Sequence, residues 1–216
     1  MCFNLNTSIA TSLSGLVSGV IALAYKQYIL GALILCYSLM QLSEVFIWAG
    51  IENDNKELNK FGTALGKYSL PAHNIAIGLG IYIATGEYIP LLVGIGFYLY
   101  IIMEVYSKDK DAPDTTEVGC ETNDCNNFAG KLKWPYDHSW YFHGFIISMI
   151  LCLIYIKPFL PNSVFISSFF TLTAAIIFLI DYNKAYGSFW CWSTAVLAPV
   201  LVLINTNLTS GINFIS

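Results

Sequence analysis

The hydrophobic pattern of the chain consists of long apolar runs separated by short polar stretches. An α-helix needs roughly 20 apolar residues to cross a ~30 Å hydrocarbon layer. Seven runs approach that length, at 8–25, 28–50, 67–85, 88–106, 139–156, 164–180 and 188–204. The pattern therefore predicts an all-α, polytopic transmembrane bundle that forms a single domain, with seven spans, or with six if one run is not a span.

Two polar stretches interrupt this pattern. The stretch 52–60 is predicted to be a loop before the third run, which is the weakest span because it contains Pro71, His73 and Asn74. The stretch 107–138 is predicted to be the only long extramembrane loop. Tyrosines and tryptophans lie near many of the proposed span ends, as expected for residues at a membrane interface.

Composition agrees with a membrane protein. Of the 216 residues, 56% are hydrophobic and 11% are charged, whereas soluble domains carry about 25% charged residues. All ten basic residues are lysines, so the bidentate phosphate contacts that require a guanidinium group cannot form. We therefore expect the lipid bilayer as a partner and no nucleic acid.

The lysines predict an orientation. With seven spans, eight lysines lie on the side of the N-terminus and of loop 107–138, and only Lys26 and Lys157 lie on the other side. The positive-inside rule then places the N-terminus and this loop in the cytoplasm and the C-terminus outside. Cys120 and Cys125 in the loop could form a disulfide, hold a metal or remain free thiols, and a cytosolic location favours the reduced state.

Polar residues inside the apolar runs predict a site. Successive spans alternate in direction, so these residues should gather beneath one membrane face. An ionisable group in hydrocarbon costs at least ~2.5 to 3.5 kcal/mol and usually faces the bundle interior. The candidate ligand-binding or ion-binding residues are Gln41, Glu44, Trp48, His73, Asn74, Glu104, His143, Asp181 and Trp190.

Structural roles are open for several of these residues. Gln41, Glu44 and Trp48 share one helical stripe because they are spaced by three and four residues, and Glu44 lies well inside its run. Glu104 and Asp181 could instead extend to the membrane interface. His73 could satisfy a backbone carbonyl near Pro71, and His143 could be a packed interfacial histidine.

Three short blocks resemble a known family. The chain begins Met-Cys-Phe at 1–3, has Gln41, Glu44 and Trp48 in the second run, and reads Gly-Ser-Phe-Trp-Cys at 187–191. Together they resemble an uncharacterised family of multipass membrane proteins that begin Met-Cys-Phe or Met-Cys-Trp, from bacteria and large DNA viruses. The resemblance covers nearly the whole chain in layout, implies a membrane protein and supplies no activity.

The first functional hypothesis is a transporter, channel or small-ligand receptor. Glu44, with Gln41, His73 and Glu104, would line a polar cavity that binds a cation, a proton or a small ligand. Buried carboxylates and imidazoles are the usual groups for this function.

Two further hypotheses stay open. A membrane-embedded metal hydrolase would use zinc held by His73, His143 and Glu44, and would resemble the seven-span ceramidase-like proteins, although their paired histidine spacing is not matched. A scaffolding protein would use loop 107–138 to bind a protein partner. Retinal is not expected, because no lysine lies in the core of a span to form a Schiff base. The sequence does not decide whether the protein is an enzyme.

Overall fold

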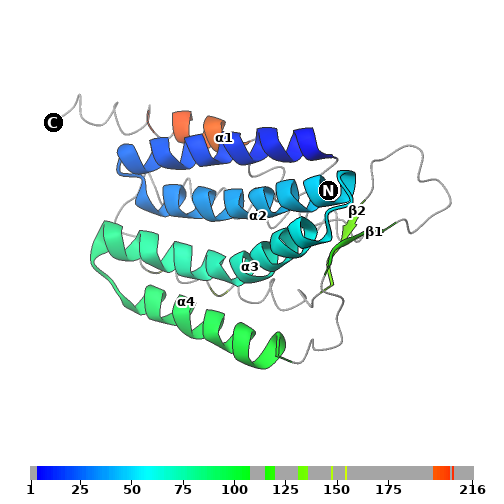
Figure 1. Ribbon diagram of the computed structural model, residues 1–216. Coiled ribbons are helices and arrows are strands. Elements are labelled where there is room, and N and C mark those ends of the chain that lie inside the picture. Colours follow the sequence, from blue (N-terminus) through cyan, green and yellow to red (C-terminus); the bar gives the residue numbers. More distant parts are fainter. Residues whose placement is uncertain are drawn as a thin grey trace.

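The computed structural model describes residues 4–107, 115–119, 131–135, 147, 154, 197–204 and 206. Its helices are α1 (Leu5–Ala24), α2 (Tyr28–Glu52), α3 (Lys56–Thr85) and α4 (Ile89–Tyr100), which continues into the π-helical turn η1 (Ile101–Val105). The strands β1 (Glu117–Gly119) and β2 (Lys131–Lys133) form a small antiparallel sheet. The four helices lie side by side in chain order, and each runs antiparallel to its neighbour (Figure 1).

Two of these helices, α1 and α2, are long and apolar enough to cross a membrane, and Ile89–Glu104 forms a shorter apolar helix. The helical class is therefore confirmed for the part of the chain that the structure describes. The last three predicted spans lie largely outside the described residues. Of the final run, residues 197–204 are helical and lie beside α1 (Figure 1).

The predicted loop at 52–60 is wrong in extent, because α3 begins at Lys56. Asn55 caps the helix, accepting a hydrogen bond from the Leu58 backbone N–H at 3.1 Å. Glu57 in the first turn complements the partial positive charge of the helix N-terminus, and Lys60 pairs with it at 3.6 Å. These polar residues form a helical end rather than a loop because the cap satisfies the exposed backbone.

Small residues let the helices approach closely, as in many membrane bundles. The face of α1 that packs on α2 is built from small or polar residues, namely Ser8, Thr11, Ser12, Gly15, Ser18, Gly19 and Ala22. A Cβ on Gly15 would overlap the Ser38 hydroxyl. On the other side of the layer, a Cβ on Gly94 of α4 would lie 2.5 Å from the Asn74 carbonyl oxygen of α3.

The loop after α4 contains a folded segment that is docked on α3. The Thr116 backbone N–H donates to Asn59 Oδ1 at 3.0 Å, the Asn59 amide donates to the Thr116 carbonyl at 3.1 Å, and the Thr116 and Thr63 hydroxyls lie 2.6 Å apart. Asn59, Thr63 and Thr116 are all buried. The base of loop 107–138 is therefore attached to the N-terminal turns of α3.

Strand β2 attaches the same segment to α2. Leu132 packs with Ile47 and Trp48 in one apolar cluster, and the Trp134 ring lies against Gly66 of α3, where a Cβ would approach it to 2.7 Å. The β1–β2 sheet thus covers the end of the layer formed by the C-terminal part of α2 and the start of α3 (Figure 1).

Candidate functional site

One stripe of α2 is apolar at its start and polar towards its end. Its members are Leu30, Ile34, Tyr37, Gln41, Glu44 and Trp48, which recur every three or four residues and so lie on one helical face. The first two pack against Ala22 of α1 and against Ala198 and Val202. The polar half is equally enclosed, since Gln41, Glu44 and Trp48 are 0%, 1% and 8% exposed.

Gln41 is held from α1. Its side-chain oxygen Oε1 accepts a hydrogen bond from the Thr11 hydroxyl at 2.7 Å. The Thr11 hydroxyl also lies 2.9 Å from the Thr7 carbonyl and 3.2 Å from the Ser8 carbonyl, so one hydrogen is shared among three acceptors. This hydrogen bond places Thr11 of α1 beside Gln41 of α2 and so sets the register between the two helices.

Glu44 lies one turn beyond Gln41. Within the described residues, its Oε2 atom is buried and has no hydrogen-bond partner. The same holds there for the Ser12 hydroxyl of α1 and for the indole Nε1 of Trp48. Trp48 follows Glu44 by four residues, about one turn along α2, whereas Ser12 follows Thr11 on the antiparallel helix α1 and so lies on the far side of Gln41 from Glu44 and Trp48. Buried polar atoms without partners are rare in proteins.

His73 is buried at a different level. Its ring meets that of Tyr37 edge to face, with centroids 4.4 Å apart. Tyr37 and Glu44 are seven residues apart on α2, or roughly 10 Å along the helix axis. The structure thus brings His73 into the α2–α3 interface about two turns away from Glu44. Asn74 is buried beside Gly94 of α4, and its side chain donates to the Pro71 carbonyl at 3.3 Å.

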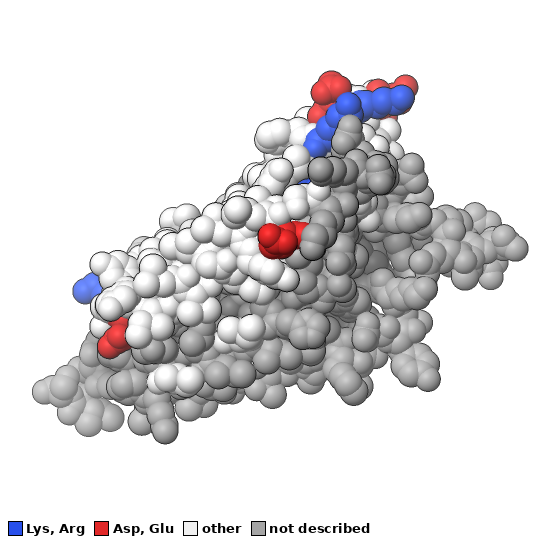
Figure 2. Space-filling model, turned by 90° about the horizontal axis from the view of Figure 1, so that it is seen from below, with Lys and Arg blue, Asp and Glu red and all other residues white. Residues whose placement is uncertain are grey.

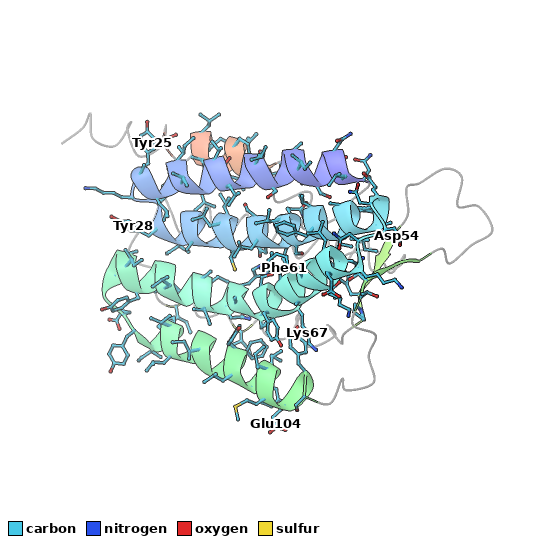
Figure 3. The ribbon with its side chains drawn as sticks, viewed as in Figure 1. Tyr25, Tyr28, Asp54, Phe61, Lys67 and Glu104 are labelled. Atoms are coloured by element: carbon cyan, nitrogen blue, oxygen red, sulfur yellow. The ribbon has the colours of Figure 1, made fainter. Side chains whose placement is uncertain are left out.

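The remaining predicted site residues divide into two groups. Glu104 lies in η1 with an exposed side chain, at the outer edge of the layer (Figure 3). His143, Asp181 and Trp190 lie outside the described residues.

The zinc hypothesis also depends on residues outside this part of the chain. Among the residues with described positions, no group of three or more His, Cys, Asp or Glu side chains could hold a metal ion. A site that joins His73 and Glu44 through His143 stays a prediction.

The sequence reasoning missed the contribution of α1. Thr11 holds Gln41, but α1 has no ionisable residue between Leu5 and Ala24, so a search for titratable groups passes over it. A usable signal was present, since serines, threonines and glycines recur on one face of an otherwise apolar run.

No protein-family model, curated protein or solved structure matches this chain. The resemblance to the Met-Cys-Phe family stays a prediction, and function is argued from the residues of the site.

Proposed function

We propose that this chain is a multispan membrane protein in which Glu44 binds an exchangeable proton or other small cation within the hydrocarbon region, as part of transport or ligand sensing. The observation that carries the proposal is the buried Glu44 carboxylate, 1% exposed, with Oε2 unpartnered among the described residues. It lies on a helix that is long and apolar enough to cross a membrane.

The two faces of α1 support a lipid environment. In a water-soluble helix the apolar stripe is buried and the polar stripe is exposed. Helix α1 has the opposite arrangement, because its buried face is small or polar and its outer face is apolar. That outer face comprises Ile9, Leu13, Val17, Val20 and Ile21, which are between 39% and 60% exposed.

Helix α4 has a similar outer face. Its exposed residues include Ile89, Leu92, Val93, Ile95, Leu99 and Tyr100, while Pro90 and Gly94 are buried. The described surface seen from this side is mostly uncharged, and its charged side chains gather mainly towards the two ends (Figure 2). Apolar surface of this extent marks a membrane or another apolar partner.

Burial of Glu44 favours a binding role over a purely structural one. A carboxylate in an apolar environment costs several kcal/mol unless it is paired or neutralised, so Glu44 requires a proton or a cation. A residue that only joined helices would use its oxygens in interhelical hydrogen bonds, which contribute on the order of 0.6 to 2 kcal/mol each. Oε2 makes no such bond to the described residues.

The proposal includes the topology expected from the sequence. It has seven spans, the N-terminus and loop 107–138 in the cytoplasm, and the C-terminus outside. The lysine distribution supports this orientation. The polar half of the α2 stripe then lies towards the cytoplasmic side.

The test compares two glutamates of α2 in sealed proteoliposomes. Glu44→Gln keeps the size of the side chain and removes its proton-binding carboxylate, whereas Glu52→Gln makes the same change at an exposed position at the end of the helix. Ion flux is followed with pH-sensitive and cation-sensitive dyes. We expect flux in the wild type and in Glu52→Gln, and its loss in Glu44→Gln. Equal flux in all three proteins, or none in the wild type, would contradict the proposal.

A further inference from the structure

We infer that the β1–β2 sheet is a gate that controls exchange between the Glu44 site and the water on the side of loop 107–138. The gate consists of the described segments 115–119 and 131–135. This inference rests on the proposed function and adds the regulation of its site. It follows from where the sheet is docked and from how it is held there.

Glu44 lies between two apolar clusters along α2. On one side, Ile34 is buried in the cluster that α2 shares with α1, and it is ten residues, or roughly 15 Å, from Glu44 along the helix axis. On the other side, Ile47 and Trp48 pack with Leu132 of β2, and they follow Glu44 by about one turn. The end of α2 that the sheet covers is therefore the nearer one to Glu44.

The sheet also reaches the turn of α2 that carries Glu44. Trp134, which directly follows β2, is half-buried, and its ring lies beside Gly66 of α3, 2.7 Å from the position of an added Cβ. The Ser43 hydroxyl lies 3.1 Å from the same position, and Ser43 directly precedes Glu44. Leu132 and Trp134 thus cover α2 at the turn of Glu44 and at the next turn (Figure 1).

The attachment of the sheet differs from the packing of the helices beneath it. Thr116 is held on α3 by hydrogen bonds with the side chains of Asn59 and Thr63. Helices α2 and α3 instead meet closely at their backbones, since a Cβ on Gly62 would lie 2.7 Å from the Ser43 carbonyl oxygen. Water can replace a hydrogen bond at a small net cost, whereas separating helices packed at this distance opens voids along their interface.

The size of the sheet points the same way. Its two strands have three residues each, and a two-stranded sheet is at best marginally stable on its own. It therefore depends on its contacts with α2 and α3. Segments that open to admit ligands come from the least stable parts of a structure. The sheet should leave the helices while α2 and α3 stay packed, which uncovers the turn of Glu44.

A reversible disulfide tests the gate in the full-length protein. Thr63 and Thr116 are both replaced by cysteine, because their hydroxyls lie 2.6 Å apart and sulfurs at these positions fall within reach of a disulfide. Flux is measured in proteoliposomes with pH-sensitive and cation-sensitive dyes, and mass spectrometry verifies the cross-link. Thr63→Cys alone, Thr116→Cys alone and the wild type are the controls, since they carry the same native cysteines through the same oxidation.

We expect oxidation of the pair to lower flux to that of Glu44→Gln and a reducing agent to restore it. Oxidation should change the flux of none of the controls. Undiminished flux through the cross-linked protein would overturn the gate and leave the proposed function intact. A pair that forms no disulfide would contradict the docked contact and so overturn the gate. Absence of Glu44-dependent flux in the wild type would overturn both the gate and the proposed function.

A second measurement needs no transport. The full-length protein in detergent is treated with a water-soluble carbodiimide and an amine, and peptide mass spectrometry compares the labelling of Glu44 with that of exposed Glu52. Leu132→Ala removes the apolar contact of the sheet, and Leu92→Ala makes the same change at an exposed position on α4. We expect Leu132→Ala to raise Glu44 labelling at least roughly 10-fold, the scale set by truncating a buried leucine, and Leu92→Ala to leave it unchanged. Equal Glu44 labelling in the two variants would overturn the gate.

Discussion

Replacement of Gly94 by alanine should separate helices α3 and α4. The added Cβ would lie 2.5 Å from the Asn74 carbonyl oxygen, 2.8 Å from its carbonyl carbon and 3.0 Å from the Ile75 nitrogen. All three atoms belong to the backbone, so no side chain can rotate away. Since ordinary contact begins near 3.4 Å, α4 must move outward by roughly an ångström.

The expected loss of stability follows from two opposing terms. Overpacking of this kind costs about 1 to 3 kcal/mol, and alanine regains about 0.5 to 1 kcal/mol of helix propensity over glycine. The net loss is about 0 to 2.5 kcal/mol, centred near 1 kcal/mol, and a loss of about 1 kcal/mol lowers the melting temperature of a chain of this size by roughly 2 to 4 °C. Asn74, a predicted site residue, would move with the interface.

Gly96→Ala is the matched control. Gly96 lies on the same helix, and nothing lies within 4 Å of the position of its added Cβ. We expect this variant to melt at or slightly above the wild-type temperature. Both variants are compared in one detergent by intrinsic tryptophan fluorescence during heating. Equal melting temperatures for Gly94→Ala and Gly96→Ala would refute the close α3–α4 packing.

Three further predictions concern the docked loop, the contact between α1 and α2, and the lipid-facing surface. Thr116→Val removes a buried hydroxyl that meets the Thr63 hydroxyl at 2.6 Å. We expect faster amide hydrogen exchange in the β1–β2 sheet, corresponding to a loss of about 1 to 3 kcal/mol in the free energy of local opening. Unchanged exchange rates would argue against the docked loop. Thr11→Val leaves the Gln41 oxygen without this donor and should destabilise the protein by about 1 to 3 kcal/mol. Thr85→Val should have a smaller effect on melting, because the half-buried Thr85 hydroxyl meets only the backbone of Ile81 and Glu87 at the end of its own helix. Spin labels at Leu13 and Leu92, which are 58% and 57% exposed, should relax with lipid-soluble oxygen, while a label at exposed Glu57 should relax with a water-soluble reagent. The lipid-facing surface would be wrong if all three labels responded to the water-soluble reagent.

Local patterns predicted much of the described fold. The apolar runs located α1, α2 and α4 within a few residues, because the length required for a span and the flanking polar residues are both visible in sequence. The start of α3 was missed for an equally local reason. The polarity of 52–60 predicts a loop, although Asn55 and Glu57 are typical of a helix N-terminus.

Contacts between distant residues could not be predicted in the same way. Thr116 meets residues 53 and 57 positions earlier in the chain, and no short pattern specifies such pairs. The β1–β2 sheet has the same origin, since its strands are three residues each and depend on docking against α2 and α3.

In the candidate site too, the positions of residues on one helix could be predicted, but the contacts between helices could not. Helical spacing placed Gln41, Glu44 and Trp48 on one stripe, and the structure buries all three. Depth along a span did not give the register between helices, which depends on the contacts of Thr11 with Gln41 and of Tyr37 with His73. These contacts place His73 and Glu44 at separate levels, which residue counting alone could not resolve.

Infrared spectroscopy of the reconstituted protein tests most directly whether Glu44 carries a proton inside the membrane. A neutral carboxylic acid has a carbonyl stretching band distinct from that of a carboxylate, and the band shifts in heavy water. We predict that the wild type and Glu52→Gln show this band at neutral pH and that Glu44→Gln lacks it. A wild-type spectrum without the neutral-acid band, or a band that persists unchanged in Glu44→Gln, would contradict a proton-binding Glu44.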